Sequence, residues 1–84
     1  MSKNVDMICR FDKNGKIRPM KFRMQVEDEL IVVNIDKILA VTEIKKDVNY
    51  KDIIYKCKCI YSNTYKIINI TFNNKTNKWS FDNI

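Results

Sequence analysis

The sequence predicts an all-β protein, a small antiparallel meander closed into an SH3-like or OB-like barrel. Glycine and proline occur once each, and no stretch has the 3.6-residue spacing of an amphipathic helix. Short segments instead alternate apolar and polar residues, separated by clusters of Asn, Asp, Lys and Thr that are typical of turns. A twisted meander of this length covers its apolar face and limits its exposed edges most economically by closing into a barrel.

Seven alternating segments are expected to be strands. In order they are Asp6–Phe11, Ile17–Gln25, Leu30–Ile35, Ile38–Lys45, Asp52–Tyr61, Tyr65–Phe72 and Lys78–Asp82. A helical turn fits only at Val26–Glu29 and Ile35–Leu39. The path of Val26–Glu29 decides between the SH3-like and OB-like topologies, which the sequence alone leaves open.

The first hairpin is centred on Gly15. Pairing Asp12 with Ile17 leaves a four-residue loop in which Gly15 takes a positive φ. Slipping a strand by one residue would move its whole apolar set to the opposite face, so the alternation specifies the register. The pairs that follow are Cys9 with Met20, Met7 with Phe22 and Asp6 with Arg23.

The two later hairpins are specified in the same way. Pairing Ser62 with Tyr65 makes Asn63-Thr64 the turn, although β-branched Thr64 disfavours a positive φ and a wider loop is the alternative. Tyr55, Cys57 and Cys59 then share a face with Phe72, Ile70 and Ile68. In the last hairpin, Asn74–Asn77 forms the loop, with Phe72 opposite Trp79 and Ile70 opposite Phe81.

These registers nominate a single hydrophobic core. Its expected members are Met7, Cys9, Phe11, Met20, Phe22, Met24, Leu39, Val41, Tyr55, Cys57, Cys59, Ile68, Ile70, Phe72, Trp79 and Phe81.

Length and composition predict one soluble domain spanning residues 1–84. Hydrophobic residues make up 45%, enough for a core, and no run approaches the roughly 18 apolar residues of a membrane span. The first residues lack the apolar segment of a secretory signal, so we expect a cytoplasmic protein without a membrane partner. Lys, Asn and Ile total 36 residues, and their codons consist mostly of A and T. An AT-rich genome therefore explains part of the net charge of +6 without a basic function.

Most enzyme classes are excluded by residue type. The chain has no histidine, which removes the usual general base and the commonest metal ligand. A single glycine cannot build a phosphate-binding loop or a nucleophile elbow. The acidic run Glu27-Asp28-Glu29 is expected to be a solvated loop, because hard cations need several converging oxygens. We therefore expect a non-enzymatic protein without a cofactor.

The three cysteines are expected to be reduced. Cys57 and Cys59 point the same way on one strand with Cα atoms about 6.5 Å apart, a poor fit for a disulfide. A structural zinc ion needs four Cys or His ligands, and only Cys9 could join the pair. Burial in the core of a cytoplasmic protein, with no metal, is the simplest interpretation.

Basic side chains on outward positions are the candidate contacts for nucleic acid or for a partner protein. They are Lys21, Arg23, Lys56, Lys58 and Lys66, with Tyr61 or Tyr65 available for base stacking. Lys56, Lys58 and Lys66 are expected to project together from the Asp52–Phe72 hairpin. The competing interpretation is an ordinary solvated sheet face, since no recognised nucleic-acid-binding motif is present.

Four isoleucines also fall on outward positions and are a candidate protein interface. They are Ile8, Ile54, Ile60 and Ile67. Grouped together, they would form an apolar patch of the kind that marks a protein contact. An oligomer of identical chains, or an adaptor for another protein, is the alternative function.

Four short motifs resemble a family of short uncharacterised proteins of low-GC Gram-positive bacteria. They are Gly15-Lys-Ile-Arg-Pro-Met-Lys-Phe-Arg23, Ile35-Asp-Lys-Ile-Leu-Ala-Val41, Tyr55-Lys-Cys57 and Trp79-Ser-Phe81. Lys37 stands where the family pattern has Arg, and Ala40 where it has Asp. Some members are encoded beside lesion-bypass DNA polymerases, so the resemblance implies an accessory role near DNA-handling proteins. From the residues themselves, an ion pair or a capped turn is expected for the charged Asp36 and Arg23.

Overall fold

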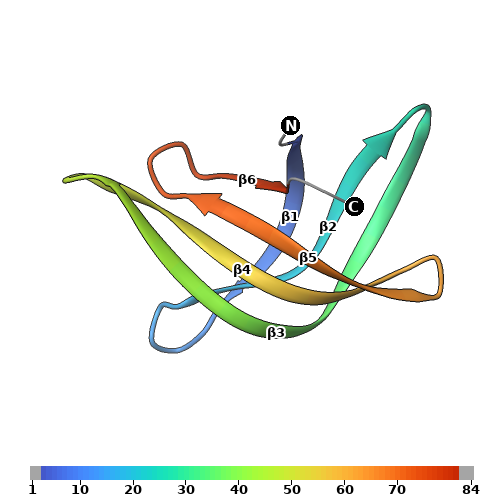
Figure 1. The fold of residues 1–84 in the computed structure, drawn as a ribbon, viewed down its shortest axis with the longest axis horizontal. Helices are drawn as coiled ribbons and strands as arrows, with labels where there is room; N and C mark the ends of the chain where they lie inside the picture. Colours follow the sequence, from blue (N-terminus) through green and yellow to red (C-terminus); the bar gives the residue numbers. More distant parts are fainter. Residues whose placement is uncertain (1–2, 82–84) are drawn as a thin grey trace.

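The computed structural model describes residues 3–81, which form a closed barrel of six antiparallel strands (Figure 1). The strands are β1 (Lys3–Phe11), β2 (Ile17–Val26), β3 (Glu29–Asp47), β4 (Tyr50–Tyr61), β5 (Thr64–Asn73) and β6 (Lys78–Phe81). Each strand pairs with the next along the chain, and β6 closes the barrel against β1. This arrangement confirms the predicted fold class and is compatible with a small SH3-like or OB-like barrel. Asp82, the predicted end of the last strand, lies outside the described residues.

The third and fourth predicted strands are one continuous strand, β3, so the seven-strand expectation was wrong. Ile35–Leu39 contains no helical turn but two bulges, in which Asp36 and Leu39 are the extra residues opposite β4. Bulges bend a strand without ending it, and Figure 1 shows β3 curving sharply across the barrel. Val26–Glu29 is also not helical. It is the tight turn of the β2–β3 hairpin, with Glu27 at φ 56°.

The β1–β2 hairpin follows the predicted register over half its length. Asp6 faces Arg23 and Met7 faces Phe22 as expected, but Cys9 faces Pro19 instead of Met20, and the loop is correspondingly longer. Met20 is the extra residue of a bulge. A proline lacks the N–H that a ladder needs and is tolerated at such a bulge. Gly15 has the predicted positive φ, 80°.

The Asp12 carboxylate stabilises the loop of that hairpin. It accepts hydrogen bonds from the backbone N–H groups of Asn14 (2.8 Å) and Lys16 (2.9 Å). These bonds, chiefly the one from Lys16, hold the pKa of Asp12 below its ordinary value.

The β4–β5 hairpin has its predicted faces but not its predicted register. Tyr61 pairs with Thr64, which makes Ser62-Asn63 the turn, with φ values of 50° and 60°. The shifted turn keeps β-branched Thr64 out of the left-handed region. Relative to the prediction the register moves by two residues, an even number, so the core residues of both strands stay on their expected face.

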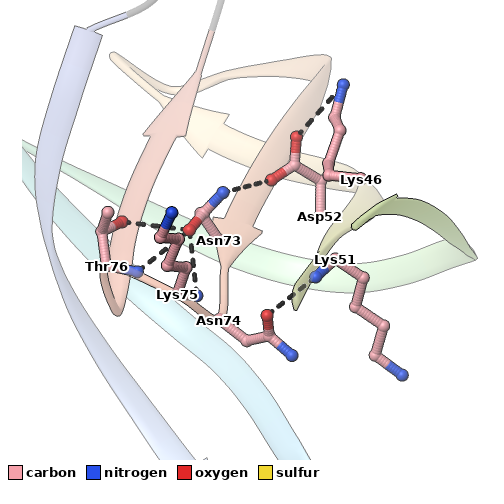
Figure 2. A network of polar contacts seen from close by, with 7 residues as sticks. All are labelled: Lys46, Lys51, Asp52, Asn73, Asn74, Lys75 and Thr76. Carbon is pink, nitrogen blue, oxygen red and sulfur yellow. Dashed lines mark hydrogen bonds and ion pairs between the residues drawn. The ribbon is translucent and has the colours of Figure 1, made fainter. Parts of the chain in front are cut away.

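The β5–β6 hairpin matches the prediction throughout. Phe72 pairs with Trp79 and Ile70 with Phe81, which leaves Asn74–Asn77 as the loop. The Asn73 side chain organises this loop by accepting backbone N–H bonds from Lys75 and Thr76 at 3.0 Å (Figure 2). Its amide also donates to Asp52 at 2.8 Å, which ties the loop to β4.

The core lies between the inner faces of the strands. Its buried apolar residues are Phe22, Met24, Val33, Tyr55, Cys57, Cys59, Ile68, Ile70, Phe72, Trp79 and Phe81, with Met7 and Cys9 half-buried against them. Trp79 is its aromatic centre, with ring centroids of Phe72 at 4.7 Å and Tyr55 at 5.6 Å. Val33 is a member that the sequence did not predict.

Four predicted core residues are exposed instead. The exposed fractions are 65% for Phe11, 41% for Met20, 44% for Leu39 and 55% for Val41. The β2–β3 ladder ends at Lys21 opposite Asn34, and beyond Ile35 strand β3 pairs only with β4. Ile17–Met20 of β2 and Ile35–Glu43 of β3 therefore face each other across an unpaired gap, which we call the seam. The apolar residues that border it lack the cover of a neighbouring strand.

Candidate nucleic-acid interface

A cluster of cations occupies the outer face of the barrel over β1 to β4. On β4, Lys56 and Lys58 alternate with buried Cys57 and so share the outward face. Lys58 lies directly opposite Lys37 of β3, and Lys21 of β2 lies opposite Asn34, the outward residue that precedes Lys37. We call the set Arg10, Arg18, Lys21, Lys37, Lys56 and Lys58 the basic face.

The pairing of Lys37 with Lys58 is unfavourable in itself. Like charges directly opposite each other in a sheet destabilise it. Within residues 3–81, neither lysine has a carboxylate within ion-pair distance. The Lys58 ammonium is 4.3 Å from the centroid of the Tyr65 ring, and this cation–π contact stabilises one of the two charges. Lys37 has no comparable contact among the described residues.

A second like-charge pair lies across the seam from Lys37. Arg10 of β1 is directly opposite Arg18 of β2, a consequence of the bulge at Met20. Both arginines line a pocket of about 270 Å³ together with Lys37 and Asp36. Asp36 is exposed on its bulge and, within the described part of the chain, makes no ion pair. The pocket therefore brings three cations together with one carboxylate, at the rim of the seam.

The sequence-predicted cations separate into three groups. Lys21, Lys56 and Lys58 belong to the basic face. Arg23 is also outward, but its guanidinium forms an exposed ion pair of 3.2 Å with Asp6, the partner that the register predicted. Lys66 was misplaced: it pairs with buried Cys59, which puts it on the opposite side of the hairpin from Lys56 and Lys58, 5.8 Å from the Tyr61 ring centroid.

Sequence reasoning missed Arg10, Arg18 and Lys37 as members of the basic face. The predicted register put Arg10 opposite Pro19, so the arginines did not meet. The missing N–H of Pro19 was the one signal of a bulge that could have corrected this register. Lys37 was assigned between two separate strands, and only the continuity of β3 places it opposite Lys58.

The four outward isoleucines do not form one patch. Ile8 and Ile60 lie in one cross-strand row but are separated by Lys21 and Asn34, about 14 Å of sheet. Ile54 is six residues from Ile60 along β4, with Lys56 and Lys58 between them. Only Ile60 and Ile67 are neighbours, beside Tyr65, which is directly opposite Ile60.

The thiols of Cys57 and Cys59 are buried in the core, as predicted, whereas Cys9 is half-buried. Burial raises the pKa of Cys57 to about 12 and that of Cys59 to about 11, so both are protonated at neutral pH. They donate weakly to the carbonyls of Tyr55 and Cys57, at 3.6 Å and 3.9 Å. A protonated, buried thiol is a poor nucleophile and a poor metal ligand.

The acidic side chains of the described residues do not form a metal site. Glu27, Asp28 and Glu29 are exposed at the tip of the β2–β3 hairpin. Among residues 3–81, no group of three or more His, Cys, Asp or Glu side chains is placed to hold a metal ion. No helix in that range is long and apolar enough to cross a membrane.

Comparison with known proteins returned no match to any family model, curated protein or solved structure. The family resemblance therefore rests on the four sequence motifs alone.

Proposed function

We propose that this protein is a non-enzymatic cytoplasmic binding module whose basic face holds the phosphate backbone of single-stranded nucleic acid. The observation that carries the proposal is two like-charge cross-strand pairs, Lys37 opposite Lys58 and Arg10 opposite Arg18. Each pair costs stability in the free protein. A phosphate bound between the two cations of a pair would convert this repulsion into attraction.

Three further features support a strand of nucleic acid as the anion. The cations come from four neighbouring strands, so they extend along the sheet surface and do not surround a single point. Tyr65 lies beside Lys58 with 56% of its surface exposed, which suits a base-stacking platform. The family resemblance, with members encoded beside lesion-bypass polymerases, favours a role as an accessory to DNA-handling proteins.

Salt dependence of binding is the first test. Affinity for a labelled oligothymidylate should fall with salt on a log–log plot, with a slope of about −0.7 for each phosphate neutralised. Reversing Lys37 and Lys58 to Glu should abolish measurable binding at physiological salt. A wild-type protein that does not bind at that salt would remove the nucleic-acid function.

Lys75→Glu with Lys78→Glu is a matched control for that variant. Each pair contains one lysine stacked on a tyrosine, since Lys75 is 4.9 Å from the Tyr50 ring centroid. Both double variants lower the net charge of +6 by the same amount. The control should retain most of the binding. Equal losses from the two pairs would show only diffuse attraction to a basic protein, whose charge the codon bias partly explains.

The like-charge pair can also be tested directly. Lys37→Glu alone creates an opposite-charge pair with Lys58, which should raise the free energy of unfolding by about 0.2–1 kcal/mol while weakening oligonucleotide binding. A stability gain with unchanged binding would mean that the pair serves no ligand.

A homo-oligomeric adaptor remains the second candidate function, and one observation favours it. Ile67 (55% exposed) and Tyr65 (56% exposed) are neighbours of half-buried Ile60 on the outer face of the β4–β5 hairpin. If this small apolar group is an interface, sedimentation should show a mass that rises with concentration and returns to that of the monomer in Ile67→Glu. A monomer at all concentrations would exclude this function.

A further inference from the structure

We propose that the second half of β3 accepts an added β-strand, an extended acidic segment of a partner protein, along its free edge. Regular pairing with β4 runs from Ala40 opposite Lys56 to Lys45 opposite Lys51. The neighbouring β2 ladder has already ended at Asn34. Among residues 3–81, no backbone hydrogen bond outside the β3–β4 ladder reaches this stretch. An unpaired strand edge of this length is the template used in β-augmentation.

The orientation of the backbone groups on this edge follows from Lys51. Its carbonyl accepts a bond from the Asn74 N–H at 3.2 Å, and its N–H donates to Asn74 Oδ1 at 2.8 Å (Figure 2). Both groups of Lys51 therefore face the β5 side. Along an antiparallel strand, the backbone N–H and C=O groups of successive residues point alternately to the strand on one side and the strand on the other. The backbone groups of the even-numbered residues of β4 therefore point toward β3. Their partners Ala40, Thr42 and Ile44 are bonded to β4, which leaves the N–H and C=O groups of Val41, Glu43 and Lys45 facing the open edge.

An apolar pocket lies beside the same edge. It has a volume of about 540 Å³ between the β1–β2 hairpin and β3, and Ile17, Val41, Ile53 and Tyr55 supply most of its apolar lining. The Tyr55 hydroxyl donates to the Ile17 carbonyl at 3.3 Å, which satisfies a backbone group left without a ladder partner there. Every second side chain of an added strand would point to this side of the sheet, so one apolar residue of the segment can enter the pocket.

The charge around the edge specifies an acidic partner. Lys16 lines the pocket, Lys45 is on the edge itself, and Arg18 and Lys37 border the adjoining pocket of the seam. The Glu43 carboxylate in this region is held in an ion pair by Lys51, and Asp36 is the other acid that borders the seam. A second copy of this chain would bring the same lysines and a charge of +6 to the edge, so it is disfavoured.

Figure 1 shows how the second half of β3 lies relative to the hairpins around it. The arm formed by the ends of β3 and β4 extends past the rest of the barrel, with the β5–β6 hairpin above it. That hairpin is joined to β4 by Asn74 and Lys51, whereas the β3 side of the arm carries no such contact among the described residues. The edge from Ala40 to Lys45 therefore has no backbone partner within residues 3–81 that an added strand would have to replace.

The test uses a labelled, end-blocked peptide that alternates Glu and Val. We expect saturable binding by fluorescence anisotropy, and amide exchange of the complex should slow by about tenfold or more at Val41, Glu43 and Lys45, while Ala40, Thr42 and Ile44 change little. Val41→Pro removes one edge N–H without removing a β4 ladder bond and should weaken binding by about tenfold. It should leave oligonucleotide binding unchanged.

Variants of the probe keep the proposal testable even if Val41→Pro perturbs folding. N-methylation of alternate peptide residues on one edge should abolish binding, and methylation on the other edge should be tolerated. A peptide that alternates Lys and Val is the control for charge. The proposal is overturned if this control binds as well as the Glu-Val peptide, or if both methylated peptides bind alike. It is also overturned if the Glu-Val peptide does not protect the three edge amides from exchange. If the edge amides become protected as the protein concentration rises without any peptide, the edge binds a second copy of the chain, and this result also overturns the proposal.

Discussion

The two halves of β3 each contain apolar residues on the inner face but have different surroundings. Glu29–Asn34 pairs with β2, and its residue Val33 is fully buried. Asp36–Asp47 pairs only with β4, and every residue in it except Ile38 is exposed. The contrast shows that an apolar residue on the inner face of a strand is not thereby buried. Burial also requires a second ladder or an opposing sheet to cover that face.

The difference begins at a few residues next to the seam. Pro19 cannot donate a hydrogen bond to a ladder, and the bulges at Met20, Asp36 and Leu39 turn the two strands apart. The exposed apolar side chains of this region, Met20, Leu39 and Val41, lie where β2 no longer covers β3. The same separation of the strands creates the pockets and the free edge. The region with the fewest buried residues is therefore also the region that offers binding sites.

The largest expected effect compares two aromatic residues, one in the closed part of the barrel and one at the exposed end of β1. Trp79→Ala should lower the free energy of unfolding by about 3–5 kcal/mol, because Trp79 is 7% exposed and packs on Phe72 and Tyr55. Phe11→Ala should cost less than about 1 kcal/mol, because Phe11 is 65% exposed. Chemical denaturation measures both variants. A Trp79→Ala variant as stable as the wild type would mean that Trp79 is a binding residue and not a core residue.

A smaller effect compares the two halves of β3 with one substitution. Val33→Ala removes buried methyl groups and should cost about 2 kcal/mol, whereas Val41→Ala should stay within about 0.5 kcal/mol. The shift of the denaturation midpoint gives the change in the free energy of unfolding of each variant, provided that the m-values are equal. If the two variants lose equal stability, the seam is closed in solution and the contrast between the halves fails.

An effect that is absent at neutral pH is the pH dependence caused by Cys57 and Cys59. Both thiols are held protonated in the folded protein, with pKa values of about 12 and 11 against an ordinary 9.0. Above pH 9 the unfolded chain loses these protons first, so stability should be unchanged below that pH and fall as the pH rises toward 11. The slope is at most about 1.4 kcal/mol per pH unit for each thiol.

Unfolding curves between neutral pH and pH 11 test this prediction, with Cys57→Ala/Cys59→Ala as the control. The control should lose the part of the slope that the thiols cause. Thiol reagents should also modify half-buried Cys9 before the two buried cysteines. Rapid modification of Cys57 in the folded protein would show that the open half of β3, which carries its partner Ile38, exposes the core as well.

The sequence by itself determined the fold class, the inner faces of β4, β5 and β6, and the last hairpin. Alternation has a period of two and is local, so Trp79 and Phe81 could be assigned to the core from neighbouring residues alone. The exposed pair of Asp6 and Arg23 followed from the same alternation. Even where the register of β4 and β5 was displaced, the displacement was by two residues and the inner face was correct.

Only the tertiary structure decided which inner faces are covered and which charges meet. Val41 and Val33 occupy equivalent positions in the pattern, and the presence or absence of β2 beside them makes one exposed and the other buried. The cross-strand pairing of Lys37 with Lys58 depends on a strand that continues through two bulges. Coverage and cross-strand contacts join residues far apart in the chain, and one bulge shifts every pair beyond it, so a local pattern cannot specify them.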